Sequence, residues 1–197
     1  MSEDWNEHAE KWDDNSDVKL YAEKAFASLV TRTDIRDISW NSKRVLDFGC
    51  GTGLLAELIS PYAKEVVAVD TSEKMIAGLT KKGIPNVTAV HADILDNNFQ
   101  REGIFFSDFD LVYASSVCSF LPNYGDAVGV LSRTLKQGGH FVQWDWLASD
   151  DDDFGLTENQ MYSALKRAHF SSIQIEPAFV IQAEGQSMPV LLGAGVR

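Results

Sequence analysis

Residues 44–55 constrain the fold of this chain more than any other segment, and they read RVLDFGCGTGLL. A β-branched apolar run contains Asp47, and glycines follow at the alternate positions 49, 51 and 53. Glycine lets the backbone turn sharply and bring its N–H groups against a ligand that a Cβ would push away. Residues 54–59 have the apolar pattern of a helix. The segment therefore predicts a strand, a ligand-binding glycine loop and a helix.

The spacing of these glycines differs from that of a dinucleotide-binding loop. The dinucleotide fingerprint, G-x-G-x-x-G, needs a third glycine where this chain has Leu54. The pattern D-x-G-x-G-x-G at residues 47–53 resembles the first motif of the class I S-adenosylmethionine-dependent methyltransferases, and small members of that family are similar to this chain throughout. The resemblance implies S-adenosyl-L-methionine as cofactor and S-adenosyl-L-homocysteine as product.

Two further apolar runs end in an acid, as the first one does. Residues 65–70 end in Asp70, residues 87–93 alternate into Asp93, and residues 109–116 are apolar enough for a strand buried on both faces. Ligands of open parallel sheets bind outside the carboxyl ends of the strands. We therefore expect these acids and the turn at 114–116 to share one edge, where Asp70 can accept both hydroxyls of a ribose.

The resemblance implies a role for each matching position. Asp47 and the glycine loop would face the methionine part of the cofactor, Asp70 would hold the ribose, and Asp93 with Ile94 would flank the adenine. The cofactor-binding residues carried over by position are Asp47, Gly49, Cys50, Gly51, Asp70, Thr71, Met75, Asp93, Ile94 and Ala114. A cofactor with a cationic sulfur and a free ammonium group suits a pocket rimmed by carboxylates, whereas an anionic nucleotide diphosphate suits it badly.

Helix signals follow several of the predicted strands. Residues 70–73 and 157–160 have capping-box spacing ahead of apolar helical faces. The sequence Lys81-Lys82-Gly83 is typical of a helix end, because basic side chains and glycine both favour that position. Residues 124–136 predict a helix that stops before the glycines at 138 and 139.

The C-terminal third predicts a strand over residues 140–146 and then a β-hairpin. Residues 172–182 and 188–196 flank a glycine-containing loop, so they bring an antiparallel strand into an otherwise parallel sheet. The expected fold class is α/β, with a Rossmann-like, doubly wound, mostly parallel sheet, helices on both faces and a C-terminal antiparallel hairpin. At 197 residues and 45% hydrophobic content, the chain suffices for one well-buried domain. We expect one methyltransferase domain over residues 1–197, with a helical lid in residues 1–40 and the core in residues 41–197.

The expected lid has two helical stretches. Asp17 can cap a helix whose apolar positions include Tyr21, and Trp5, His8 and Trp12 follow the same rhythm upstream. Small methyltransferases of the resembled group often use such a segment as a lid. Trp12 and Tyr21 are therefore candidates for cofactor contact, with core packing as the equal alternative.

Composition excludes several classes of partner. The net charge is −12 and no basic run extends beyond two lysines, which disfavours nucleic acid binding. No apolar stretch reaches membrane-spanning length, and the first four residues include two acids and no basic residue, so we expect a cytoplasmic protein without membrane insertion. Cys50 and Cys118 are expected to be reduced packing thiols, with no disulfide and no metal site. The acidic residues 149–153 are expected to be a solvated loop, and the sequence does not predict the oligomeric state.

The expected reaction is in-line transfer of a methyl group to a small-molecule acceptor, with most of the acceleration from alignment and exclusion of water. If the acceptor carries a proton, Asp145, His8 and Tyr21 are the candidates for a base, and Asp145 lies nearest the end of a predicted strand. None of the three has a decisive signal. An alternative hypothesis is a non-catalytic S-adenosylmethionine-binding module or regulatory partner. A nicotinamide oxidoreductase is a third hypothesis, which rests on the shared sheet alone.

Overall fold

The computed structural model describes residues 5–96, 108–148, 154–183 and 185–197. The chain forms two compact units, Met1–Asp93 and Ile94–Arg197, and each is described by itself. The acidic stretch at 149–153 and the first four residues lie outside the described residues. The prediction of a single domain over the whole chain stays a prediction.

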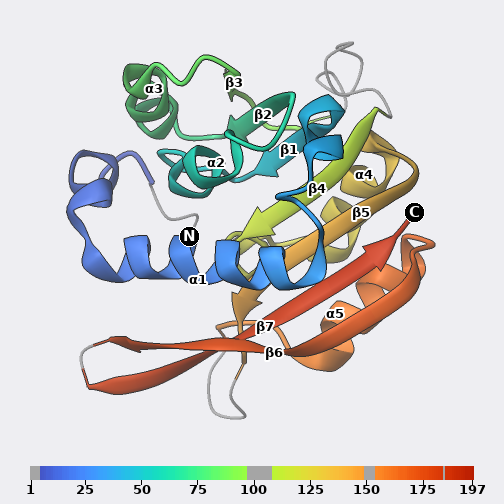
Figure 1. Cartoon of the computed structure of the whole chain (residues 1–197). Helices are drawn as coiled ribbons and strands as arrows, with labels where there is room; N and C mark the ends of the chain where they lie inside the picture. The colour runs from blue at the N-terminus through green and yellow to red at the C-terminus, as the bar shows by residue number, and fades with distance from the viewer. Residues whose placement is uncertain (1–4, 97–107, 149–153, 184) are drawn as a thin grey trace. The chain divides into compact units, whose positions relative to one another are not determined.

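The first unit alternates helices and parallel strands (Figure 1). Its elements are η1 (Ala9–Asp14), α1 (Ser16–Arg32), η2 (Ile38–Ser42), β1 (Arg44–Phe48), α2 (Leu54–Ile59), β2 (Glu65–Asp70), α3 (Glu73–Lys82) and β3 (Val87–His91). β2 pairs in parallel with β1 on one side and with β3 on the other, and Val66 stands opposite Val45 and Val87. Because both neighbours are parallel, the carboxyl ends of all three strands lie at one edge.

The second unit adds a mixed arrangement of strands. Its elements are β4 (Phe109–Ser115), η5 (Cys118–Phe120), α4 (Tyr124–Thr134), β5 (Leu135–Trp146), α5 (Glu158–Arg167), β6 (Ser171–Ala183) and β7 (Gln186–Val196). β4 pairs in parallel with β5, whereas β7 runs antiparallel to both β5 and β6. The described residues thus contain a mostly parallel set of seven strands that ends in an antiparallel hairpin. The predicted fold class and the predicted hairpin are confirmed.

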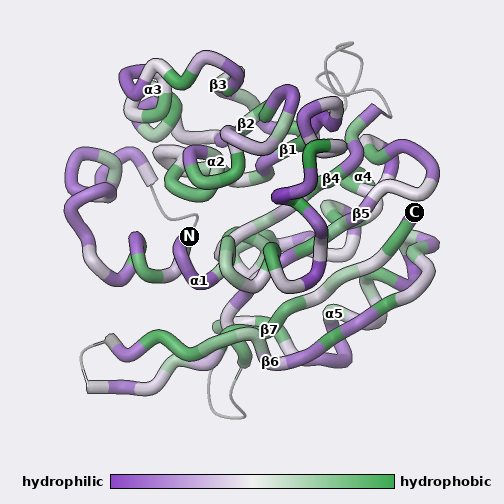
Figure 2. Tube along the Cα trace, in the orientation of Figure 1, coloured by the Kyte–Doolittle hydropathy of each residue, from purple (hydrophilic) through white to green (hydrophobic). Residues whose placement is uncertain are grey.

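The core of the first unit comes from the strands and from one face of α1. Val45, Leu46, Val66 and Val67 are fully buried, as apolar runs in parallel strands require. Hydrophobic and hydrophilic residues alternate along α1 (Figure 2). Its buried face consists of Tyr21, Ala22, Ala25 and Leu29. The predicted amphipathic helix is therefore present, with Tyr21 in the buried face.

Three local predictions need correction. The cap of α1 is Asn15, whose side-chain oxygen accepts the N–H groups of Asp17 and Val18, so Asp17 lies in the first turn instead. The helical rhythm expected upstream of α1 is present only as a 3-10 helix over residues 9–14, and this helix has no buried residue. The predicted helix at 124–136 ends at Thr134, because Leu135 already pairs with Phe109 as the first residue of β5.

In the part of the chain that the structure describes, no helix is both long and apolar enough to cross a membrane.

Candidate functional site: a glycine loop at the carboxyl ends of the strands

The glycine loop follows β1 and has the backbone conformation that only glycine adopts readily. Gly49, Gly51 and Gly53 have φ angles of 70°, 53° and 79°. These values lie in the left-handed region, where a Cβ would cost roughly 1–2 kcal/mol per residue. All three glycines of the motif are thus required by the turn itself, and Gly53 is also the N-cap of α2.

Hydrogen bonds fix the loop to the neighbouring strand β2. The N–H groups of Gly49 and Cys50 both donate to the carbonyl oxygen of Val69, at 2.9 and 3.0 Å. The N–H of Gly51 donates to Oδ2 of Asp70 at 2.8 Å. The strand-end acid therefore supports the loop as well as bordering it.

The three predicted acids lie at the ends of three adjacent strands. Asp47 is paired with Ala68 near the end of β1, Asp70 ends β2 opposite His91, and Asp93 follows β3 by two residues. Asp47 is buried at 2% exposure, Asp70 is half-buried and Asp93 is exposed. Neighbouring strands are about 4.8 Å apart, so the acids are gathered at one edge, as the sequence predicts.

Asp70 also shapes the start of the next helix, but it is not the cap of that helix. Its Oδ1 accepts the N–H of Ser72 at 2.8 Å, and the N-cap is Ser72, whose hydroxyl oxygen accepts the N–H of Met75. The capping-box prediction at residues 70–73 therefore had the right helix and the wrong cap. Asp70 cannot be the cap, because its backbone still belongs to the ladder between β2 and β3.

The thiol of Cys50 reports the electrostatic field at the loop. Burial raises the pKa of Cys50 well above its usual value, and the carboxylates of Asp47 and Asp70 raise that pKa further. Both effects disfavour an anion at this position. The same carboxylates favour a cation, so Asp47 and Asp70 suit a positively charged ligand.

Thr71 and Met75 complete the predicted set in the first unit. Thr71 is exposed, and its carbonyl oxygen lies 3.1 Å from Nε2 of His91. Met75 is buried, and its sulfur lies 4.0 Å from the position that a Cβ on Gly51 would occupy. Met75 thus borders the loop and contributes to the core at the same time.

The candidate residues of the expected lid differ in burial and in distance from the glycine loop. The indole nitrogen of Trp12 lies 3.4 Å from the Cβ position of Gly51, so Trp12 covers the glycine loop. Tyr21 is buried at 6% exposure in the packed face of α1. His8 is exposed, and its ring lies 5.9 Å from that of Trp5. Of these candidates, the geometry places Trp12 beside the loop.

The remaining candidates belong to the second unit. Ala114 in β4 is fully buried and Ile94 is 3% exposed. Asp145, the acid between two tryptophans of β5, is fully buried and does not point to solvent. Its carboxylate accepts the N–H groups of Cys118 at 2.8 Å and Ser119 at 3.2 Å. Burial raises the pKa of Asp145 to about 6, although these hydrogen bonds oppose the rise.

Asp145 stands in a buried polar cluster at this end of β5. Gln143, two residues before it, is fully buried, and its side-chain oxygen accepts the hydroxyl of Tyr124 at 3.0 Å. Burial, together with the charges of Cys118 and Asp145, raises the pKa of Tyr124. The cluster holds the turn after β4 against β5, and its carboxylate is already engaged by two backbone donors.

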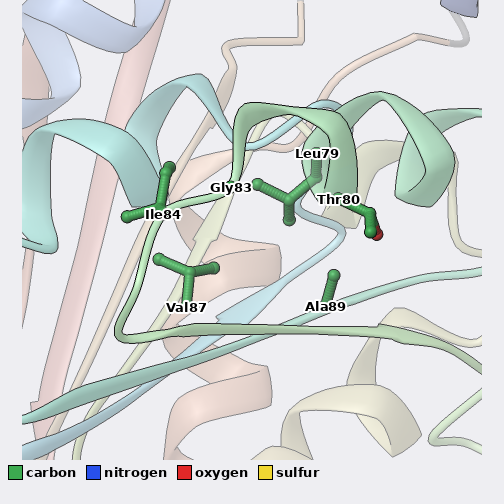
Figure 3. A pocket seen from close by; sticks show the side chains of 6 residues that line it. All are labelled: Leu79, Thr80, Gly83, Ile84, Val87 and Ala89. Atoms are coloured by element: carbon green, nitrogen blue, oxygen red, sulfur yellow. The ribbon is translucent and has the colours of Figure 1, made fainter.

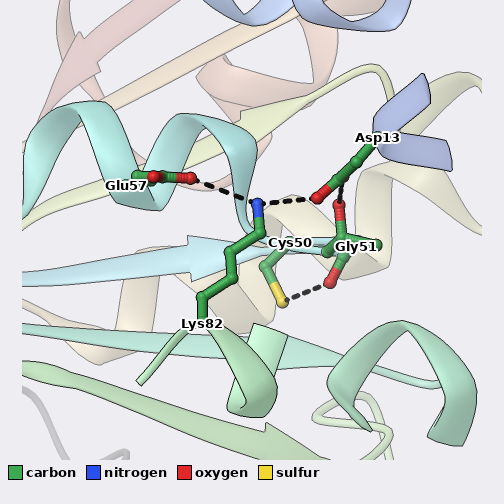
Figure 4. A network of polar contacts seen from close by, with 6 residues as sticks. Asp13, Cys50, Gly51, Glu57 and Lys82 are labelled. Atoms are coloured by element: carbon green, nitrogen blue, oxygen red, sulfur yellow. Dashed lines mark hydrogen bonds and ion pairs between the residues drawn. The ribbon is translucent and has the colours of Figure 1, made fainter. Parts of the chain in front are cut away.

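Sequence reasoning missed a network that joins the N-terminal segment to the loop. Asp13 accepts the hydroxyl of Thr52 and forms an ion pair with Lys82, which also pairs with Glu57 (Figure 4). Thr52 is buried at 3% exposure within the glycine motif. In the sequence, the only trace of this contact is a threonine between two glycines, and its need for a polar partner becomes evident once the structure shows that its hydroxyl is buried.

Comparison with known proteins decides the family. The sequence model described as "Methyltransferase domain" matches residues 46–143, a segment that runs from β1 to the middle of β5. The chain belongs to the methyltransferase-domain family. The resemblance predicted from residues 47–53 is therefore confirmed.

The relatives of this chain include two bacterial proteins. The uncharacterized methyltransferase YcgJ of Bacillus subtilis is 30% identical over 145 residues, which cover 68% of this chain and 52% of YcgJ. Trans-aconitate 2-methyltransferase of Azoarcus is 30% identical over 133 residues, which cover 65% of this chain and 48% of the relative. The chain thus spans about half the length of the curated relatives it matches.

Solved structures share the fold of this chain. The crystal structure of YcgJ superposes with a TM-score of 0.68 at 17% identity and covers 87% of this chain and 98% of the other. The N-methyltransferase NodS of Bradyrhizobium japonicum, solved with S-adenosylhomocysteine, gives a TM-score of 0.67 at 18% identity and covers 99% of both chains.

Proposed function

We propose that this chain is an S-adenosylmethionine-dependent methyltransferase that acts on a small-molecule acceptor. The observation that carries the proposal is the pair of carboxylates, Asp47 and Asp70, beside a glycine loop whose three glycines have positive φ. The charge of that pair, felt by the thiol of Cys50, suits a cationic cofactor.

The residues proposed to hold the cofactor follow from their places at this edge. The backbone of the glycine loop and Asp47 would face the methionine part, with its ammonium group. Asp70 would accept the ribose hydroxyls, since each carboxylate oxygen can accept a further bond beside the one from Gly51 or Ser72. Cys50, Thr71, Met75, Asp93 and Trp12 are proposed as further contacts, and Tyr21 as support for the lid. Ile94 and Ala114 of the second unit are proposed as contacts from the family resemblance alone.

S-adenosylmethionine supplies a methyl group on a cationic sulfur, which needs little covalent help from the protein. The residues of this chain would therefore act by holding the reactants in line and by excluding water. Alignment of this kind is worth roughly 7–11 kcal/mol of the barrier in well-oriented reactions. Trp12, which covers the loop, is the described side chain placed to exclude water there.

No base is assigned among the described residues. Asp145 has a pKa of about 6, which suits a base, but its carboxylate is buried and bonded to two backbone N–H groups. Tyr21 is buried in α1, and His8 lies on the exposed N-terminal segment. We propose that methyl transfer depends on positioning and that any proton is lost to solvent.

A small-molecule acceptor agrees with the charge and with the relatives. A net charge of −12 works against the phosphate contacts that dominate nucleic acid binding. The name of the Azoarcus relative, trans-aconitate 2-methyltransferase, gives a small molecule as its acceptor. A cytoplasmic location stays a prediction from the sequence.

Calorimetry and methyl transfer test the proposal together. S-adenosylhomocysteine is titrated into the wild type, Asp70→Ala and the control Asp34→Ala, which removes an exposed carboxylate away from the loop. We expect binding to the wild type and the control, and at least about tenfold weaker binding to Asp70→Ala. Absence of binding to the wild type would overturn the proposal. Binding without transfer of labelled methyl to any of a broad acceptor panel would favour the non-catalytic binding module.

A further inference from the structure

The N-terminal strap, residues 5–14, is attached to the first unit by polar contacts. Its helical part, η1, has no buried residue, so a hydrophobic core does not hold it. One attachment lies at the start of α3, where Oδ1 of Asn6 accepts the hydroxyl of Ser72 at 2.9 Å and the N–H of Lys74 at 3.1 Å. These bonds hold the first half of the strap.

The second attachment lies at the other end of α3 and is centred on Asp13 (Figure 4). One carboxylate oxygen of Asp13 accepts the hydroxyl of Thr52 within the glycine loop. The other oxygen lies 3.0 Å from Nζ of Lys82, the last residue of α3. Asp13 therefore joins the strap, the loop and the helix at one point.

Lys82 is shared between two carboxylates. Its Nζ lies 3.2 Å from Oε2 of Glu57 on α2, in addition to its contact with Asp13. The side chain of Lys82 is 18% exposed, whereas those of Asp13 and Glu57 are 41% and 55% exposed. If Asp13 moves away, Glu57 still neutralises the ammonium group of Lys82. Opening of the strap therefore leaves no buried charge unpaired.

Between the two attachments, the strap places Trp12 on the ligand-binding loop. Its indole nitrogen lies 3.4 Å from the Cβ position of Gly51. Trp5 supports Trp12 edge-on, with ring centroids 6.0 Å apart. Because Asp13 directly follows Trp12, the ion pair to Lys82 fixes the tryptophan that covers the loop.

We propose that Asp13 and Lys82 are positioning residues that hold Trp12 over the glycine loop and thereby set how long the cofactor stays bound. The proposal rests on the proposed function only for the identity of the ligand beneath the strap. A partly exposed ion pair is weak and is screened by salt. This ion pair between Asp13 and Lys82, called the latch below, is therefore reversible. Reversibility suits a segment that must uncover the loop in every catalytic cycle.

Dissociation kinetics test the latch with S-adenosylhomocysteine as the probe, followed by tryptophan fluorescence in stopped flow. We expect Lys82→Met and Asp13→Asn each to speed dissociation about two- to fivefold, and the double variant to add nothing to the larger single effect. Lys81→Met, the neighbouring lysine of α3, is the matched control and should leave the rate unchanged.

Salt and ligand-free measurements separate the latch from the proposed function. In about 1 M NaCl, where the Debye length is about 3 Å, the wild type should approach the rate of Lys82→Met. Hydrogen exchange of residues 5–14 without ligand should be faster in Lys82→Met than in Lys81→Met. If the wild type binds no S-adenosylhomocysteine, the proposed function fails and this exchange experiment alone decides the latch. Equal behaviour of Lys82→Met and Lys81→Met would overturn the latch.

Discussion

The carboxylate of Asp70 accepts the backbone N–H of Gly51 at 2.8 Å, which joins the glycine loop to the end of the neighbouring strand. The other oxygen of Asp70 accepts the N–H of Ser72 at the same distance. The residue expected to hold a ribose is thus itself held on two sides. Its orientation is fixed before any ligand arrives, and pre-organisation of this kind lowers the cost of binding.

The charge of Asp70 should be measurable through Cys50. In a Cys118→Ser background, Asp70→Asn removes one of the two carboxylates that raise the pKa of the Cys50 thiol. We expect the apparent pKa for alkylation of Cys50 by iodoacetamide to fall, with a several-fold faster reaction at a fixed pH. The parent Cys118→Ser protein is the control. An unchanged alkylation profile would show that Asp70 contributes no field at the loop.

The third glycine of the motif should be required for packing as well as for backbone conformation. At Gly53 a Cβ would lie 2.4 Å from Cδ1 of Leu79, whereas at Gly83 it would meet nothing within 4 Å, and both residues have positive φ. We expect Gly53→Ala to lower the free energy of unfolding by about 2–4 kcal/mol and Gly83→Ala by about 1 kcal/mol. Urea unfolding measures both, and equal losses would contradict the packing argument.

Burial of Asp145 predicts a pH dependence of stability. Because the native pKa is about 6 and the ordinary value is 3.8, the native protein binds this proton more tightly than the unfolded chain. Asp145 therefore stabilises the native state most below about pH 4. Its contribution to the free energy of unfolding falls by roughly 3 kcal/mol as the pH rises from about 4 through 6. The stability advantage of the wild type over Asp145→Asn should shrink over that window.

Urea unfolding between about pH 4 and 7 checks this expectation for Asp145. Asp126→Asn, which removes a carboxylate whose side chain is 77% exposed, is the comparison. A difference between wild type and Asp145→Asn that stays constant across the window would mean that Asp145 titrates at its ordinary pKa.

A hollow of about 160 Å³ between α3 and β3 offers a stabilising substitution (Figure 3). Ala89 lines it, together with Leu79, Val87 and Ile84. Ala89→Val should fill part of the hollow and raise the free energy of unfolding by about 0.5–1 kcal/mol. Thr88→Val, on the opposite and exposed face of β3, adds a similar apolar group outside the hollow. If the free energy of unfolding rises equally in both variants, strand propensity explains the effect and cavity filling does not.

Local patterns were enough to predict the strands and the loop. Residues 65–70 were expected as a strand and form β2 with those bounds, because four consecutive apolar positions, three of them valine, favour a buried strand. The loop at 49–53 could be predicted because its backbone conformation needs glycine at each alternate position. The caps were harder, since Asn15 and Asp17, or Asp70 and Ser72, are both good cap residues two positions apart.

The polar contacts of the site depend on tertiary structure and could not be predicted from the sequence. Alternation along β5 puts Asp145 and Gln143 on the same face, but only the packed structure shows that this face is buried. The pairing of Asp13 with Lys82 joins residues distant in the sequence, and both are of types usually found on solvated surfaces. Neither arrangement leaves a periodic signal in the chain.

A crystal structure with S-adenosylhomocysteine is the most direct measurement of the central proposal, that the loop at 49–53 and the acids beside it hold the cofactor. The account predicts ribose hydroxyls within about 3.2 Å of the Asp70 carboxylate and the amino-acid part of the ligand against Asp47 and the loop. A nucleoside bound away from these residues, or no bound ligand in crystals grown at saturating concentration, would contradict it.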